Sequence, residues 1–262
     1  MLKKRLIGVV TVKNGSAVQS FGYKRYLPLG KPECLVENLD RWGADEILVQ
    51  VIDRSINQLG PDFSMIERLG KLGLGTPLIY AGGIRSVEDG IRLIRGGADR
   101  LVVDALLHDN PSVVQSLANQ LGAQALIAAL PLSCCDGALL WNEYRSKSQL
   151  AMSSQAVDLI SSKLISEVLI IDWMNEGNSM GFNTRLLQML PFKKPLIAFG
   201  GISQAEKMRD LLHISEVVAV AVGNFLSYKE HAVQSRKKML LGMPIRPPEY
   251  MKNYSLMAEA HD

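Results

Sequence analysis

The chain contains few cysteines and few aromatic residues. Three of its 262 residues are cysteine and 6% are aromatic. Cys34, Cys134 and Cys135 have no C-x-x-C spacing and no histidine close by in the sequence, which argues against a metal site, and their odd number argues against a disulfide framework. We therefore predict no metal, no cofactor, thiols in the core or in loops, and a cytoplasmic protein. A nucleophilic role for Cys134 or Cys135 is the weaker alternative.

The sequence also lacks a long hydrophobic run and a strong excess of one charge. No segment reaches the ~20 apolar residues of a membrane-spanning helix, and the apolar run near the N-terminus stops at Thr11 without a signal-peptide cleavage pattern. The formal net charge is +3, and Lys and Arg form no long stripe. Neither a membrane nor a nucleic acid is therefore predicted as a partner. Arg236-Lys237-Lys238 is predicted to be the solvated end of a helix.

Short β-type runs alternate with amphipathic helical stretches along the chain. Nearly continuous apolar strands separated by helices are typical of a buried parallel sheet. Eight such units in a chain of this length predict an α/β fold, a (β/α)8 barrel. Helices are expected over 87–96, 111–121 and 204–212, with N-terminal signals at Ser86, Asn110 and Ser203. The predicted strands span 5–10, 46–51, 77–80, 100–103, 125–130, 167–171, 196–199 and 217–222.

Several motifs occur twice, half a chain apart. Glu46-Ile47-Leu48-Val49 recurs as Glu167-Val168-Leu169-Ile170, and Asn14-Gly15 recurs as Asp136-Gly137. A half-barrel duplicated once explains these offsets together, and we predict a single barrel over residues 1–243 with a two-fold half-barrel repeat. Residues 244–262, which include Pro244, Pro247 and Pro248, are expected to form an irregular tail.

Each half also carries a Gly-Gly turn directly after a strand, Gly82-Gly83 in the first half and Gly200-Gly201 in the second. Glycine pairs at such places let backbone N–H groups approach an anion closely, because no Cβ stands in the way. The two turns predict either a ligand with two negative ends or a scaffold inherited from a protein that bound one.

The order of these motifs resembles the cyclase subunit of imidazole glycerol phosphate synthase over most of the chain, from about Met1 to Phe225. The resemblance implies that a HisH-like glutaminase docks on the bottom of the barrel and that ammonia passes through the barrel core. At the top, a bis-phosphorylated substrate would be cleaved and cyclised. The matching segments are 3–7, 12–15, 43–46, 81–84, 96–100 and 110–112, with Gly177, Gly181, Gly200 and Gly201.

Four charged residues stand at or near the start of predicted strands: Arg5, Glu46, Arg100 and Glu167. The resemblance implies that they form a ring that gates ammonia at the barrel bottom, with Arg100 in place of the family's lysine. Two positive and two negative side chains can neutralise one another when buried. Any one of them alone would also fit a surface charge beside a strand. Asp99 matches a residue that helps to dock the glutaminase.

Other residues occupy the positions of the family's catalytic acids at the top of the barrel. The two aspartates that act as general acid and base correspond to Thr11 and Pro131, which cannot exchange protons near neutral pH. A substrate-contacting lysine corresponds to Gln19, and a threonine of the sixth strand to Ile171. The known cyclisation is therefore not expected. The candidate phosphate-binding residues are Gly82, Gly83, Gly200, Gly201, Gly223, which replaces a serine, and Asn224.

Four carboxylates remain at predicted strand ends: Asp53, Asp104, Asp172 and Glu176. Together on the top face they could support a different acid–base reaction. The alternative is that they cap helices or accept hydrogen bonds from loop amides. The histidines show no metal-binding spacing and receive no role.

A barrel that keeps the bottom ring and loses the top acids predicts an ammonia-conducting subunit. Segments 59–63 and 80–85 look similar to cyclase paralogues encoded in surface-polysaccharide gene clusters. With a glutaminase, those paralogues serve a third, ATP-dependent amidotransferase that converts an acetamido sugar into an acetamidino sugar. Two alternatives stay open: an enzyme in its own right, either the cyclase of histidine biosynthesis or a barrel with new chemistry, and a purely structural docking module.

Overall fold

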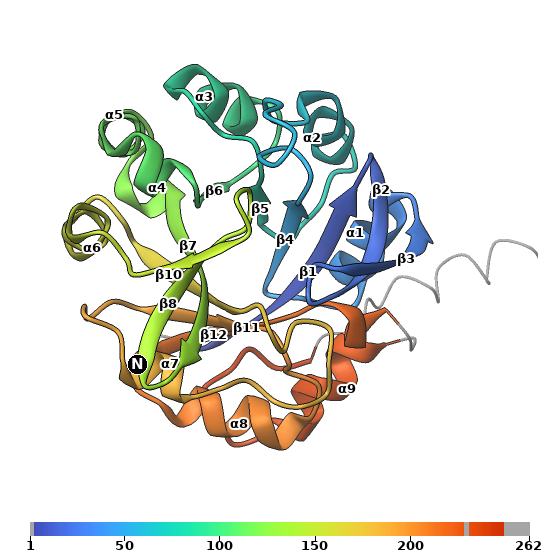
Figure 1. Ribbon diagram of the computed structural model, residues 1–262. Helices are drawn as coiled ribbons and strands as arrows, with labels where there is room; N and C mark the ends of the chain where they lie inside the picture. The colour runs from blue at the N-terminus through green and yellow to red at the C-terminus, as the bar shows by residue number, and fades with distance from the viewer. Residues whose placement is uncertain (1–2, 228–230, 249–262) are drawn as a thin grey trace, which may run out of the picture.

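The computed structural model describes residues 3–227 and 231–248, and these form a closed ring of eight parallel strands (Figure 1). The strands are β1 (Arg5–Lys13), β4 (Glu46–Val51), β5 (Leu78–Ala81), β6 (Arg100–Val103), β7 (Leu126–Cys135), β10 (Glu167–Asp172), β11 (Leu196–Phe199) and β12 (Val217–Val222). They pair in the order β1-β4-β5-β6-β7-β10-β11-β12, and β12 pairs again with β1. The predicted (β/α)8 barrel is confirmed.

Helices surround the ring and cover the outer faces of the strands (Figure 1). Val87 to Arg95 is helical as predicted, and Ser86 and Asp89 cap its start reciprocally. The third predicted helix begins after Gln204, which makes no side-chain cap, so the signal assigned to Ser203 is wrong. The helices are α1 (Pro32–Arg41), α2 (Phe63–Gly70), α3 (Val87–Arg95), α4 (Leu106–Asp109), α5 (Pro111–Leu121), α6 (Ser154–Ser161), α7 (Arg185–Gln188), α8 (Ala205–His213) and α9 (Ala232–Met239), with short 3-10 turns η1 (Ala123–Ala125) and η2 (Asn224–Leu226).

Two antiparallel hairpins extend the barrel at one end, and the sequence analysis did not predict them. The first is β2 (Ser16–Phe21) with β3 (Arg25–Gly30), and the second is β8 (Ala138–Glu143) with β9 (Ser148–Leu150). Each follows a long barrel strand through a tight turn, Asn14-Gly15 or Asp136-Gly137, in which both residues have positive φ. Such turns match the twist of paired strands. The same arrangement, a tight turn followed by an antiparallel hairpin, therefore occurs after the first and the fifth barrel strand, as a half-barrel repeat requires.

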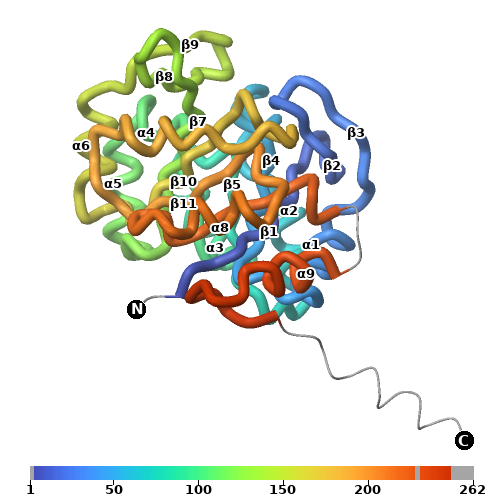
Figure 2. Tube along the Cα trace, turned by 90° about the horizontal axis from the view of Figure 1, so that it is seen from below, coloured from blue at the N-terminus to red at the C-terminus, as the bar shows by residue number. Residues whose placement is uncertain are grey.

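The opposite end of the barrel holds the start of β1 and the end of the described chain. Figure 2 shows α9 beside β1, far from hairpin β8–β9. The Lys4 N–H donates to Pro244 O at 2.7 Å, and Lys4 forms an isolated parallel bridge with Ile245. Lys237 is buried and paired with Asp45, so the predicted solvation of this helix end is wrong for Lys237. Residues 249–262 of the predicted tail lie outside the described residues.

Two apolar clusters pack on the two faces of the barrel strands, because successive side chains of a strand point to opposite sides. One lies between strands and helices, and the other fills the barrel interior. Within 3–227 and 231–248, no helix is long and apolar enough to cross a membrane. The three cysteines are free thiols, with Cys34 and Cys135 exposed and Cys134 half-buried.

Candidate functional site

Four charged side chains meet at the amino-terminal end of the barrel strands and form a closed ring. Arg5 reaches Glu46 Oε2 at 2.8 Å and Glu167 Oε1 at 2.7 Å. Arg100 Nη1 reaches Glu46 Oε1 at 3.1 Å and Glu167 Oε2 at 2.9 Å. Each arginine therefore bridges both glutamates, and all four carboxylate oxygens have a partner. The structure brings together the four residues singled out in the sequence.

The two arginines of the ring are held differently. Burial lowers the pKa of Arg5, but the charges of Glu46 and Glu167 outweigh it, and the pKa is raised overall. Among the described residues, Arg5 hydrogen-bonds through its side chain only to these glutamates. Arg100 also donates from Nε to Gln124 O at 3.1 Å and from Nη2 to Ser166 Oγ at 3.0 Å. Arg5 is thus the arginine that can leave the ring with fewer bonds broken.

A buried ion pair lies beside the ring and holds the strand starts that carry Arg5 and Glu46. Asp45 precedes Glu46, and its Oδ2 accepts the N–H of Leu6, the neighbour of Arg5, at 2.8 Å. Its Oδ1 accepts Lys237 Nζ of α9 at 2.7 Å, and both side chains are almost fully buried. The pair joins the starts of β1 and β4 to the C-terminal helix. Sequence reasoning missed it, because a lysine in a basic cluster gives no sign that it will be buried.

Asp99 lies next to Arg100 on the same end of the barrel. Its Oδ2 accepts the N–H of Leu78 at 2.7 Å, and its own N–H donates to Leu78 O at 2.8 Å. The side chain is exposed. Asp99 therefore fastens β5 to the start of β6 and still presents a carboxylate to a partner; its docking role stays a prediction.

A cluster of apolar side chains packs inside the barrel above the ring. On β6 the inward positions run from Arg100 in the ring through Val102 in the cluster. An ion pays a large desolvation cost in such surroundings, whereas a small neutral molecule does not. The cluster consists of Ile7, Val9, Leu48, Ile79, Ala81, Val102, Ile127, Ala129, Leu169, Ile171, Ile197, Phe199, Ala219 and Ala221.

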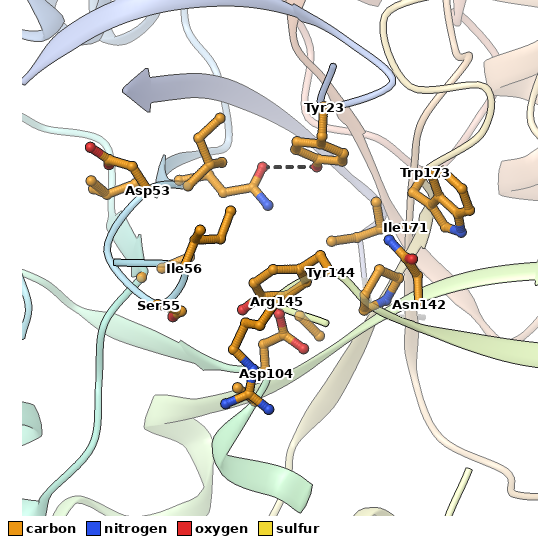
Figure 3. A pocket seen from close by; sticks show the side chains of 18 of the residues that line it. Tyr23, Asp53, Ser55, Ile56, Asp104, Asn142, Tyr144, Arg145, Ile171 and Trp173 are labelled. Carbon is orange, nitrogen blue, oxygen red and sulfur yellow. Dashed lines mark hydrogen bonds between the residues drawn. The ribbon is translucent and has the colours of Figure 1, made fainter. Parts of the chain in front are cut away.

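A cavity of about 760 Å³ opens at the carboxyl end of the strands (Figure 3). Hairpin β8–β9 contributes Asn142 and Gln149, and the turn between its strands contributes Arg145. On the opposite side, Tyr23 donates its hydroxyl to Gln50 Oε1 at 3.2 Å. Among the described residues, no group of three His, Cys, Asp or Glu side chains is placed to hold a metal ion.

Thr11 and Pro131, which the resemblance assigns to the positions of the family's two catalytic acids, lie at this end of the barrel. Pro131 lines the cavity beside Ile171, its partner on β10. Thr11 is buried on β1 and pairs with Gln50 of β4 and Val18 of β2. A threonine hydroxyl and a proline ring give this region no general acid or base at the two positions.

The first Gly-Gly turn borders the cavity, but its glycines also serve the fold. A Cβ on Gly82 would come within 2.3 Å of Val51 O, and Gly82 has a φ of +127°. The N–H of Gly83 donates to Ser55 Oγ at 3.3 Å. Glycine is therefore required here by the neighbouring backbone, whether or not an anion binds, and one of the two expected anion donors already has a partner.

The second Gly-Gly turn faces very little space. The cavity beside Gly200, Gly201 and Gly223 measures about 10 Å³, roughly the room that a single water molecule needs. Asn224 fills this region: its Oδ1 accepts Ser20 N–H at 3.2 Å and its Nδ2 donates to Ser20 O at 2.6 Å. Asn224, which lines this cavity, is thus tied to the first hairpin and has its side-chain amide already paired.

Two of the four top-face carboxylates hold loops, as the alternative explanation expected. Asp172 Oδ2 accepts the N–H of Asn183 and the side-chain amide of Asn175, both at 2.8 Å. Glu176 Oε2 accepts the Ser20 hydroxyl at 2.9 Å and the N–H of Tyr23 at 3.2 Å. Asp172 and Glu176 are buried.

The other two carboxylates, Asp53 and Asp104, line the cavity. Asp53 Oδ2 accepts the N–H of Asn14 at 2.9 Å. Burial raises the pKa of Asp104 to about 7, although a hydrogen bond from Tyr144 acts to lower it. Figure 3 shows Ser55, Tyr144 and Asp104 gathered at one side of the cavity. Tyr144 was not a sequence candidate, since its hairpin was not predicted.

Comparison with known proteins shows the family to which this barrel belongs. The sequence profile of the family described as "Histidine biosynthesis protein" matches residues 5–232. The chain belongs to this family. Members similar to it are named "Imidazole glycerol phosphate synthase subunit HisF". The one from Pyrococcus furiosus is 26% identical over 94% of this chain and 99% of the relative. The one from Exiguobacterium sibiricum is 28% identical over 86% and 91%. The resemblance seen in the sequence is confirmed.

Proposed function

We propose that the chain is the ammonia-conducting subunit of a glutamine amidotransferase complex. One contrast carries the proposal: the four-residue ring at the bottom is complete, whereas Thr11 and Pro131 stand where the family has its acids. Ammonia is mostly protonated in neutral water, and an apolar interior admits only the neutral nucleophile. The ring supports control of its entry, and the apolar cluster supports its passage.

A HisH-like glutaminase docks at the ring end in this proposal, with Asp99 among its contacts, and a third, ATP-dependent amidotransferase receives ammonia at the cavity end. The acceptor is an acetamido sugar of a surface polysaccharide, which becomes an acetamidino sugar. The complex works in the cytoplasm. An anion that binds to the chain binds at Gly82-Gly83, because the cavity at Gly200-Gly201 holds only about 10 Å³.

Adding the chain to its glutaminase is expected to raise the rate of glutamine hydrolysis several-fold and to give a complex on a sizing column. The reason is that, in this proposal, the glutaminase becomes fully active only when it is docked on the ring end of the barrel. Lys147→Glu, in the hairpin at the other end, is the control and should stimulate as the unaltered chain does. If the mixture shows neither stimulation nor a complex, the proposal is wrong.

The cyclase of histidine biosynthesis is the alternative function. The family assignment and the cavity beside Gly82 and Gly83 favour it. A docking module without ammonia transfer is the third reading.

A further inference from the structure

The carboxyl group of Asp104 lies where the barrel interior meets the top cavity. It follows Val102 by two positions, directly after the end of β6, and lines the cavity. Its Oδ1 is buried and has no hydrogen-bond partner among the described residues. Buried polar atoms of folded proteins nearly always have a partner. An acceptor left open beside the apolar barrel interior therefore points to a ligand that donates.

The charges around Asp104 favour a cation over an anion. Arg145, whose positive charge acts on Asp104, donates to Glu143 Oε1 at 2.7 Å and to Asp109 Oδ1 at 2.9 Å. Two carboxylates thus face one guanidinium, and this group of three side chains is net negative even before Asp104 ionises. Of the other titratable groups there, burial raises the pKa of Tyr23 and Tyr144 and lowers that of His108, so all three are uncharged at neutral pH.

The remaining positive groups of the cavity lie at its mouth. Lys24 and Lys147 are exposed, and Lys13 Nζ stands over the ring of Tyr26, 3.7 Å from its centroid. The cavity walls also offer the aromatic rings of Tyr23, Tyr144 and Trp173 (Figure 3). Aromatic faces attract small cations. The position of Asp104, its unpaired Oδ1 and the carboxylates close to it all favour a small, cationic ligand that donates hydrogen bonds.

We propose that Asp104 is the receiving site for ammonia that leaves the barrel interior, and that it holds the nitrogen there as ammonium. This inference rests on the conduit proposed above. The ammonia lone pair takes the carboxyl proton of Asp104: the O–H bond breaks, a fourth N–H bond forms, and ammonium is paired with the carboxylate. Return of the proton to Asp104 releases neutral ammonia, the nucleophile, to the acceptor. No other reactant is consumed.

The environment of Asp104 suits both halves of this exchange. Burial raises its pKa to about 7, and the charges of Glu143 and Asp109 act in the same direction, while Tyr144 and Arg145 oppose them. Protonated and ionised forms are therefore both present near neutral pH. Because ammonium pairs with the ionised form, its affinity rises with pH and gains about tenfold between pH 6 and pH 8.

Titration of the purified full chain with ammonium chloride tests the site. The carboxyl carbon of Asp104, assigned by NMR with D104N, should show a saturable shift in the millimolar range that sodium chloride at equal ionic strength does not reproduce. Asp53→Asn, which alters the other acid of the cavity, is the matched control and keeps the shift. Tyr144→Phe removes a hydrogen bond that lowers the pKa of Asp104, so the pH midpoint of binding should rise.

A shift that never saturates, or that sodium produces equally, overturns the proposal. So does a pH midpoint that stays unchanged in Y144F, given that this variant unfolds at the same temperature as the unaltered chain. The ammonium titration and the glutaminase assay can fail separately, because stimulation of the glutaminase does not involve Asp104. Stimulation without ammonium binding refutes only the receiving site, whereas absent stimulation refutes the conduit.

Discussion

A bacterial strain that lacks the cyclase of histidine biosynthesis is expected to stay unable to grow without histidine when it produces this chain. General acid–base groups each contribute about 10²–10⁴-fold to a rate. The resemblance assigns the positions of the family's two acids to Thr11, which is buried in the sheet, and to Pro131, whose ring has no proton to exchange. We expect the purified chain, supplied with ammonia and the cyclase substrate, to be slower than an active cyclase by at least about 10⁴-fold.

Two controls make this result interpretable. The strain's own cyclase, expressed from the same plasmid, must restore growth, and the chain must be detected as folded protein in the cells. Growth without histidine would refute the loss of cyclase activity and would show that other cavity residues, such as Asp104, replace the missing acids.

Replacing Glu167 by alanine is expected to have the second large effect, on both stability and coupling. Glu167 accepts from Arg5 and from Arg100, so its loss leaves two guanidinium groups short of a partner at once. The free energy of unfolding should fall by about 2–4 kcal/mol, below the upper range for buried ion pairs because the side chain is 16% exposed. Urea denaturation measures this change.

The same variant separates a conduit from a docking module. With the ring broken, glutamine hydrolysis in the complex should continue while glutamine-dependent amidation of the acceptor falls at least tenfold. Glu33→Ala is the control for stability, since Glu33 pairs with Arg68, which is 52% exposed, and should cost less than about 1 kcal/mol. Unchanged amidation in E167A would favour the docking module.

The barrel could be predicted from the sequence because its signal is local and repeated. Each strand has a mostly apolar run, and the predicted starts and ends of β4, β6, β11 and β12 coincide with the observed ones. The hairpins could not be predicted in this way, since β3 is largely exposed and carries no continuous apolar run. The positive-φ turns Asn14-Gly15 and Asp136-Gly137 were the available signal.

The candidate site also has residues that the sequence could predict and residues that it could not. The ring was accessible because resemblance and strand position indicated the same four residues. The partners that support it were not, because Asp45 and Lys237 meet across 192 positions of the chain, and only the packing of α9 brings them together. The second Gly-Gly turn shows the opposite limit: its motif is intact, yet the cavity beside it holds only about 10 Å³ and is lined by Asn224, whose side chain is bonded to Ser20.

The isotopic origin of the transferred nitrogen tests the conduit most directly. The glutaminase, this chain and the amidotransferase are combined with glutamine labelled with nitrogen-15 in its amide and with an excess of unlabelled ammonium. Passage through the barrel predicts a product that carries nitrogen-15 despite the excess, and loss of that preference with Glu167→Ala. A product with the isotope ratio of the bulk ammonium would contradict the account.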